Sequence, residues 1–175
     1  MEKQYSEILG TPVVIDEMPR PVGRVQDLIM DPESGNLVAF SVGQNRVIVP
    51  RDVIRLHRHL LIHDRDDICH SEDILRIGEI QKLGSGILKN KVETEEGDYI
   101  GKVFDYSVET KTNALKKIFV AKNFLGLLRI DERIIPKKHI VEILPGKIVI
   151  KGSTTKIPIK QLEENMIAEE EFSQV

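Results

Sequence analysis

Side chains that could do chemistry are densest between residues 57 and 70. Four of the five histidines and the only cysteine fall within these 14 residues: His57, His59, His63, Cys69 and His70. Imidazole and thiolate are the usual ligands of zinc, and the first two histidines would share one face of a strand. The spacing matches no established zinc pattern, however, and solvated positions beside an apolar strand are the simpler explanation. We expect no metal or other cofactor, and these five residues remain weak metal-ligand candidates.

A second set of functional side chains is basic and lies near a proline in each half of the chain. Three arginines follow Pro50, two lysines follow Pro136, and a further arginine precedes Pro136. If the two halves fold alike, these clusters occupy equivalent places, where several cations together could contact phosphates or an acidic partner. Charged turns without a ligand are the alternative, because no aromatic side chains are interleaved. The candidate binding residues are Arg51, Arg55, Arg58, Arg129, Lys137 and Lys138.

Catalytic motifs are absent from the sequence. There is no GxSxG, Walker loop, GxGxxG or HExxH, and no nucleophile stands in a recognisable arrangement with a histidine. Asp27 and Asp105 occupy equivalent positions of an internal repeat, one in each copy. This placement favours a recurring structural hydrogen bond over a pair of catalytic acids. We predict that the protein is not an enzyme.

The internal repeat is the most informative feature of the chain. Residues 22–27 (Val-Gly-Arg-Val-Gln-Asp) reappear as residues 100–105 (Ile-Gly-Lys-Val-Phe-Asp), and residues 47–54 reappear as residues 133–140. Two matches in the same order indicate a duplicated domain, since solenoids use shorter and more numerous units. Gly23 and Gly101 mark places where the backbone should bend or be closely approached.

Short strands separated by regular turn signals predict an all-β fold. Residues 31–36 (Asp-Pro-Glu-Ser-Gly-Asn) form a strong turn, because proline presets φ and glycine tolerates a positive φ. Pro50 should end its strand, and residues 51–54 then fit one helical turn. We expect two tandem small β-barrels of about six strands, with short helical turns, one of them capped by Ser71. The expected divisions are residues 1–77 with the linker, residues 78–155, and an edge strand with an acidic tail or short helix in residues 156–175.

Charge is unevenly distributed, although the 175-residue chain has a net charge of only −3. Residues 1–77 carry 9 basic and 13 acidic side chains, residues 78–151 carry 14 and 10, and residues 152–175 carry 2 and 5. The second domain is mildly basic but falls well short of a nucleic-acid-binding composition. A single cysteine, no apolar N-terminal run and no stretch of about 18 apolar residues predict a cytoplasmic protein without direct membrane insertion.

The ordered set of motifs resembles the PRC-barrel family. It comprises apolar-Gly-basic-Val-x-Asp at residues 22–27, Asp-Pro-x-x-Gly at 31–35, a strand at 37–42 and Val-Pro with a polar turn at 49–54. The second copy retains 100–105 and 135–140 but departs at 109–113, where Asn113 can still take a left-handed turn position. The family is a compact β-barrel found in the photosynthetic reaction-centre H subunit and at the C-terminus of a ribosome maturation factor. The resemblance implies an adaptor-like barrel without common catalytic residues.

We therefore predict a non-catalytic adaptor or scaffold that binds another macromolecule, with protein as the leading class of partner. Exposed strand edges can accept an added strand, and a tandem pair can combine two weak sites. An RNA-processing or ribosome-maturation-associated factor is the alternative, suggested by the resemblance and by the basic second domain. Homo-oligomerisation stays open, as does association with a photosynthetic membrane complex, which rests on the family's name alone.

Overall fold

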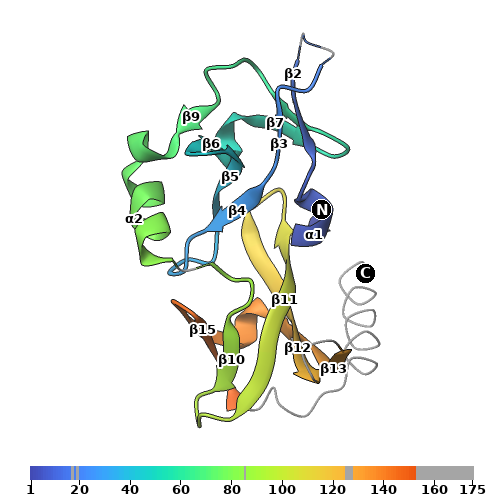
Figure 1. Cartoon of the computed structure of the whole chain (residues 1–175), viewed down its shortest axis with the longest axis vertical. Coiled ribbons are helices and arrows are strands. Elements are labelled where there is room, and N and C mark those ends of the chain that lie inside the picture. The colour runs from blue at the N-terminus through green and yellow to red at the C-terminus, as the bar shows by residue number, and fades with distance from the viewer. Residues whose placement is uncertain (17, 19, 85, 125–127, 153–175) are drawn as a thin grey trace, which may run out of the picture.

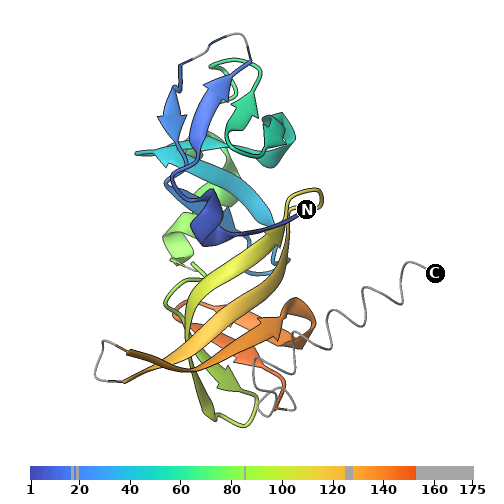
Figure 2. The same cartoon turned by 90° about the vertical axis from the view of Figure 1, so that its right-hand side faces the viewer.

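The chain folds into two β-rich units that meet end to end (Figures 1 and 2). The computed structural model describes residues 1–152 except 17, 19, 85 and 125–127, and the side chains of 123, 124 and 128–130 are not described either. The first unit, coloured blue to green, occupies one end of an elongated molecule, and the second, lime to orange, occupies the other. Strands dominate and the helices are short, which confirms the predicted all-β class.

The first unit contains two four-stranded sheets, ordered β3–β2–β8–β7 and β4–β5–β6–β9. A 3-10 helix, η1 (Pro50–Asp52), separates β6 from β7 and provides the helical turn predicted after Pro50. The strands are β2 (Pro12–Ile15), β3 (Gly23–Arg24), β4 (Asp27–Met30), β5 (Leu37–Gly43), β6 (Arg46–Ile48), β7 (Val53–Leu56), β8 (Leu60–Ile62) and β9 (Cys69–His70).

The second unit is built on one larger sheet, ordered β13–β12–β11–β10–β15–β14. The N-terminal strand β1 (Glu2–Gln4) joins this sheet by pairing with β11, and a second 3-10 helix, η3 (Lys137–His139), precedes β14. The remaining strands are β10 (Lys91–Thr94), β11 (Tyr99–Glu109), β12 (Ala114–Phe124), β13 (Leu128–Pro136), β14 (Ile140–Leu144) and β15 (Lys147–Ile150).

Five strand pairings of the first unit recur in the second. The parallel pair β2–β8 matches β10–β15, and the antiparallel pair β7–β8 matches β14–β15. The pairs β2–β3, β4–β5 and β5–β6 match β10–β11, β11–β12 and β12–β13. Even the register is shared, since Val13 lies opposite Gly23 and Val92 lies opposite Gly101. The sequence repeat is therefore also a repeat of backbone pairing.

The described strands do not close into barrels, so the predicted pair of tandem small β-barrels is not confirmed. In the first unit the chain passes from one sheet to the other at Val25 and Gln26. The Val25 amide donates to the carbonyl of Thr11 (2.9 Å), whereas the Gln26 amide donates to the carbonyl of Ser41 (2.7 Å). Because one of these adjacent amides bonds beside β2 and the other to β5, which belong to different sheets, the hydrogen-bond ladder is interrupted here and the sheet is divided in two. Within the residues described, β7 and β14 each pair on one side only and are free edges.

Two turns with the same conformation precede β5 and β12. Gly35 has a φ of 73° and Asn113 a φ of 59°. The amide of each donates to the carbonyl four residues earlier, at 2.8 Å to Asp31 and 2.7 Å to Glu109. Asparagine enters this left-handed region more readily than most residues, so losing the glycine leaves the turn intact. The sequence-based expectation for Asn113 is confirmed.

The equivalent aspartates make the recurring hydrogen bond that the repeat predicts. Asp27 Oδ1 accepts from the amide of Leu28, and Asp105 Oδ1 accepts from the amide of Tyr106, both at 2.8 Å. Asp105 also accepts a bond of 2.6 Å from the hydroxyl of Ser6. These carboxylates therefore fix local backbone conformation, one in each unit.

The two turns bind each other where the units meet, a junction we call the seam. The Leu37 amide donates to the carbonyl of Asn113 (2.7 Å), and the Leu115 amide donates to the carbonyl of Gly35 (2.9 Å). Leu37 and Leu115 are equivalent in the repeat, as are Gly35 and Asn113, so the contact is reciprocal like the interface of a two-fold dimer. A β-bridge between equivalent residues 36 and 114 completes it.

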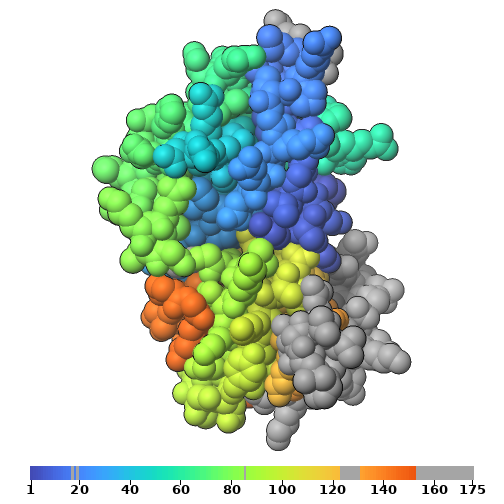
Figure 3. All heavy atoms as spheres, viewed as in Figure 1, coloured from blue at the N-terminus to red at the C-terminus, as the bar shows by residue number. Residues whose placement is uncertain are grey.

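One hydrophobic core continues through the seam. It joins buried side chains of the first unit, such as Phe40 and Leu60, to those of the second, such as Tyr106 and Ile118. Tyr5, in helix α1 (Tyr5–Ile8), stacks on Tyr106 with ring centroids 5.1 Å apart. In the space-filling view the two units are in direct contact across the visible face (Figure 3). Residues 2–8 thus pack against the second unit, although they precede the first in sequence.

Helix α2 (Leu75–Leu83) covers the outer face of the β4–β5–β6 sheet (Figure 1). Its Ile77 and Ile80 pack in a separate small cluster with Ile29, Ala39 and Val47. The helix expected from Ser71 is a 3-10 turn, η2 (Ser71–Asp73), and the α-helix begins two residues later.

Arg76 of α2 ties the linker to the seam turn of the first unit. Its Nη2 donates to Asp31 Oδ1 at 2.6 Å and to Glu33 Oε2 at 2.7 Å. Burial alone would raise the pKa of Asp31, but hydrogen bonds from Arg76, Ser34 and the Glu33 amide together lower that pKa below its usual 3.8. Because the folded pKa is depressed, the stabilisation is present above pH 3.8 and is lost as pH falls through the folded pKa.

We expect Asp31→Asn to lower the urea midpoint of unfolding at pH 7 and to differ less from wild type at pH 2. The asparagine removes the charged acceptor of Arg76, whereas wild type loses the same charge by protonation at low pH. Urea titrations at both pH values measure this difference. Glu79→Gln, which removes a long, exposed contact of 3.5 Å to the same arginine, is the control. An equal difference between wild type and Asp31→Asn at both pH values would contradict the assignment.

The two repeat glycines differ in how strictly they are required. A Cβ on Gly101 would lie 2.6 Å from the backbone oxygen of Ala121, whereas a Cβ on Gly23 would have its nearest neighbour at 3.7 Å. The close backbone approach expected from the sequence is therefore confirmed at Gly101, and the space at Gly23 is ordinary.

We expect Gly101→Ala to destabilise the fold by about 2 kcal/mol or more, because the backbone of β12 must move away. Gly23→Ala, at the equivalent position, should change the free energy of unfolding by less than about 1 kcal/mol. Urea denaturation of both variants tests this. Equal losses at the two positions would show that the contact with Ala121 is not what requires the glycine.

Candidate functional site

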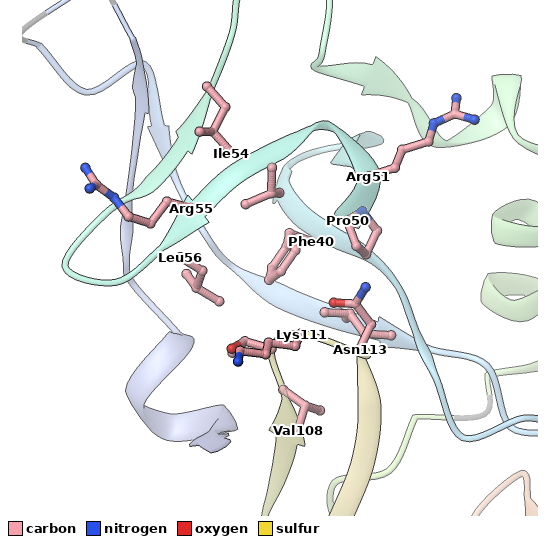
Figure 4. A pocket seen from close by; sticks show the side chains of 12 residues that line it. Phe40, Pro50, Arg51, Ile54, Arg55, Leu56, Val108, Lys111 and Asn113 are labelled. Atoms are coloured by element: carbon pink, nitrogen blue, oxygen red, sulfur yellow. The ribbon is translucent and has the colours of Figure 1, made fainter. Parts of the chain in front are cut away.

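A groove of about 460 Å³ opens at the seam, between the η1–β7 segment of the first unit and the β11–β12 turn of the second. We call it the Phe40 groove, after the residue at its centre (Figure 4). Leu37, Phe40 and Val108 are buried residues of the shared core, and Val53 and Leu56 pack partly buried beside them. Core residues of both units therefore support the groove from beneath, and Val53 and Leu56 supply the apolar surface of its floor.

The groove runs along the free edge of β7. Four consecutive residues of this strand, 53–56, line it. Side chains alternate between the two faces of a strand, so a groove that touches four residues in a row follows the edge of the strand. Ile54 is the extra residue of a β-bulge opposite β8 and is 43% exposed. Unpaired backbone groups and an exposed apolar side chain thus lie together.

Three cations border the Phe40 groove: Arg51, Arg55 and Lys111. In Figure 4 the side chains of Arg51 and Arg55 extend in opposite directions away from the central Phe40. Arg51 is highly exposed and has a long contact of 3.6 Å with Asp52, while Arg55 and Lys111 have no ion pair among the described residues. The rim is therefore cationic at both ends, and its charge is largely unneutralised.

A second groove, of about 450 Å³, is related to the first by the repeat. Here β14 of the second unit faces the turn at 31–35 of the first. The strand register makes Val141 the equivalent of Ile54, one residue later than the sequence match of 47–54 with 133–140, and Val141 takes the bulge position with 48% exposure. We call it the Val141 groove. Its rim carries Glu33, Glu142 and Lys137.

The two grooves differ in charge at equivalent positions. The shared register of β7–β8 and β14–β15 places Arg55 where the second unit has Glu142. The matching seam turns, offset by 78 residues, place Lys111 where the first unit has Glu33. The Phe40 groove is thus basic, whereas the Val141 groove carries two carboxylates and one lysine, and its Glu33 is paired with Arg76.

The structure brings together only part of the predicted basic surface. Arg51 and Arg55 share the Phe40 groove, and Arg58 lies exposed in the β7–β8 turn outside it. The backbone of Arg129 lies in β13, but its side chain is not among those described. Lys111, which the sequence did not single out, joins the groove because the β11–β12 turn crosses the seam. The sequence offered one signal for Lys111: it lies in the turn at 109–113, where the second copy departs from the family pattern.

Lys137 and Lys138 lie at a separate, lysine-rich surface of the second unit. A depression of about 550 Å³ there is lined by these two residues together with Lys116 and Lys117. Lys117 is paired with Glu2 at 3.1 Å, and burial lowers the pKa of Lys137. Lys137 and Lys138 lie in η3, which takes the place of η1 with Arg51 in the first unit, but the two turns line different surfaces.

The histidine and cysteine candidates do not converge. His57 and His59 flank the tight β7–β8 turn, His63 follows β8, and Cys69 and His70 form β9 beside β6. Across residues 1–152, with the gaps given above, no three His, Cys, Asp or Glu side chains are grouped so that they could hold a metal ion.

Two tyrosines at the seam have raised pKa values for structural reasons. Burial, followed by the nearby Asp27 carboxylate and its hydrogen bond, raises the pKa of Tyr5 to about 12. Burial also raises the pKa of Tyr106 well above its usual value, with Asp27 and Tyr5 adding to the effect. Both phenols therefore stay neutral across the physiological range and act as packed core groups of the seam.

Comparison with known proteins identifies the first unit. Residues 1–67 match the family model of the PRC-barrel domain. No curated protein is similar enough to match the chain. None of the helices in the described part of the chain is long and apolar enough to cross a membrane. The matched segment covers β1 through β8, with the split sheets and the β7 edge described above, so this part of the chain is a PRC-barrel domain.

Proposed function

We propose that the protein is a non-catalytic cytoplasmic adaptor, built from two tandem PRC-type units, that binds a protein partner at its seam. The second unit is a diverged copy of the first, because five strand pairings, the seam turn and the bulge recur in it. The matched family model covers the first unit only, so the copy rests on this repeated geometry.

The observation that carries the proposal is the pair of equivalent grooves along free strand edges. Each places unpaired backbone beside an exposed β-branched side chain, Ile54 in one groove and Val141 in the other. A segment of a partner can add to such an edge through main-chain hydrogen bonds, while pockets beside the edge select its side chains. Two grooves on one rigid core would let a partner with two segments bind more tightly than through one.

RNA binding is the second candidate function, and the lysine-rich depression favours it. Lys116, Lys137 and Lys138 supply cations that could contact phosphates. No base-stacking platform accompanies them in the described residues lining this depression, and aromatic stacking is the usual complement in single-strand binding. We therefore rank protein binding first.

We expect a photo-crosslinking residue, p-benzoylphenylalanine, at position 54 or 141 to give discrete protein adducts in cells. The same residue at Tyr99, which is 46% exposed and lines neither groove, is the matched control. Denaturing gels and mass spectrometry of the adducts provide the measurement. Similar adduct patterns at all three positions would contradict a partner at the seam.

Nuclease treatment and salt separate the two candidate functions. A protein bound through an apolar groove should be crosslinked equally after nuclease treatment. RNA binding predicts two different results: the adducts disappear after nuclease treatment, and the double variant Lys116→Ala with Lys138→Ala weakens a steeply salt-dependent RNA complex. Both results together would favour the RNA function over the adaptor function. Fluorescence anisotropy with a labelled 12-nucleotide RNA at two salt concentrations measures this directly.

A further inference from the structure

We propose that the Phe40 groove binds an extended, acidic segment of a partner protein, with an apolar residue on its floor and carboxylates at both ends. This inference rests on the proposed adaptor function and specifies the ligand chemistry of one of its two grooves.

The floor sets the need for an apolar residue. Its accessible apolar surface comes from the partly buried Val53 and Leu56 and from Ile54, which is 43% exposed. Phe40, Leu37 and Val108 lie beneath this surface and are no more than 5% exposed. At about 460 Å³ the groove has room for a few side chains. A ligand made of charge alone would leave this surface in contact with water, whereas an aliphatic or aromatic side chain would cover it.

The rim sets the need for acidic residues at both ends of the ligand. Arg51 and Arg55 lie at opposite ends of the groove and point away from its centre (Figure 4). A single phosphate or carboxylate on the floor would therefore not meet both guanidinium groups. An extended segment that spans the groove places its flanking residues near the two arginines and Lys111, where carboxylates form charge-assisted hydrogen bonds.

The strand edge sets the extended conformation. The groove follows residues 53–56 of β7, whose second edge is unpaired in the described chain. A segment lying there can pair with β7 as β8 does on the other side. Backbone hydrogen bonds would supply affinity that tolerates sequence variation, and the rim charges would supply selectivity.

The Val141 groove shows that these charges are not a requirement of the fold. At positions equivalent to Arg55 and Lys111 it carries Glu142 and Glu33, with the same strand edge and the same bulge. The same groove architecture therefore forms with basic or with acidic side chains at these two positions. Folding does not require the basic rim, and we assign its charges to ligand binding. The Val141 groove lacks the basic rim and should not attract the acidic ligand that the Phe40 groove binds.

The test uses the full chain and a fluorescein-labelled peptide, Glu-Glu-Val-Leu-Val-Glu-Glu, in anisotropy titrations. We expect saturable binding that weakens as salt is raised. The double variant Arg55→Glu with Lys111→Glu, which copies the charges of the Val141 groove, should weaken binding at least tenfold. Arg58→Glu changes an exposed arginine outside the groove and should change affinity less than twofold. Unchanged urea midpoints would show that both variants are folded.

Three further outcomes would overturn the inference. These are equal binding of the peptide with lysine in place of glutamate, equal binding by the double variant, and no binding to the full chain. If crosslinks at position 54 persist in cells while the peptide fails to bind, the adaptor function stands and the acidic-segment inference falls. A peptide N-methylated at alternate amides should bind at least tenfold more weakly if it adds to β7.

Other occupants of the groove give distinct results that would also overturn the inference. A variant in which Glu169, Glu170 and Glu171 are changed to glutamine tests the chain's own acidic segment. If this variant binds the peptide tenfold more tightly, that segment competes for the groove. If sedimentation shows dimers that the double variant abolishes, a second copy is the occupant. If the labelled 12-nucleotide RNA displaces the peptide, the groove binds nucleic acid.

Discussion

The reciprocal pairing of two turns at the seam is the contact on which the rest of the structure depends. Leu37 bonds to Asn113 and Leu115 to Gly35, so each unit completes the backbone hydrogen bonding of the other. Both turns need a residue with positive φ, since only then can the chain present its amides and carbonyls across the junction. The shared core, the packing of α1 on β11 and both grooves follow from the orientation that this contact imposes.

The repeated strand pairings explain why there are two grooves, and the different side chains on their rims explain why the grooves differ in charge. A pseudo-two-fold contact places the turn of each unit over the free edge strand of the other, so a groove beside one edge must have a counterpart beside the other. Nothing in the backbone then constrains the rim side chains, because they are exposed and outside the core. The charges at equivalent positions are opposite: one groove has Arg55 and Lys111, and the other has Glu142 and Glu33.

The sequence predicted what depends on local chemistry and missed what depends on contacts between the copies. Asn113 could be assigned a left-handed turn, and Pro50 a strand end, because each effect is local. The split at Val25 and Gln26 could not be foreseen, since it depends on which distant carbonyl each amide meets. The groove was only half predicted: Arg51 and Arg55 were recognised as a cluster, whereas Lys111 reaches them only across the seam.

The basic rim also bears on how an unpaired strand edge avoids self-association. Edge strands pair readily with one another unless charge, a bulge or a covering segment prevents it. β7 combines a bulge at Ile54 with Arg55 in the strand, so antiparallel pairing of two β7 edges would bring like charges together. The same arginine that disfavours a second copy favours a carboxylate, because reversing the charge of the incoming strand reverses the sign of the interaction. If the groove binds the acidic segment that we propose, the feature that keeps this edge open also selects the partner.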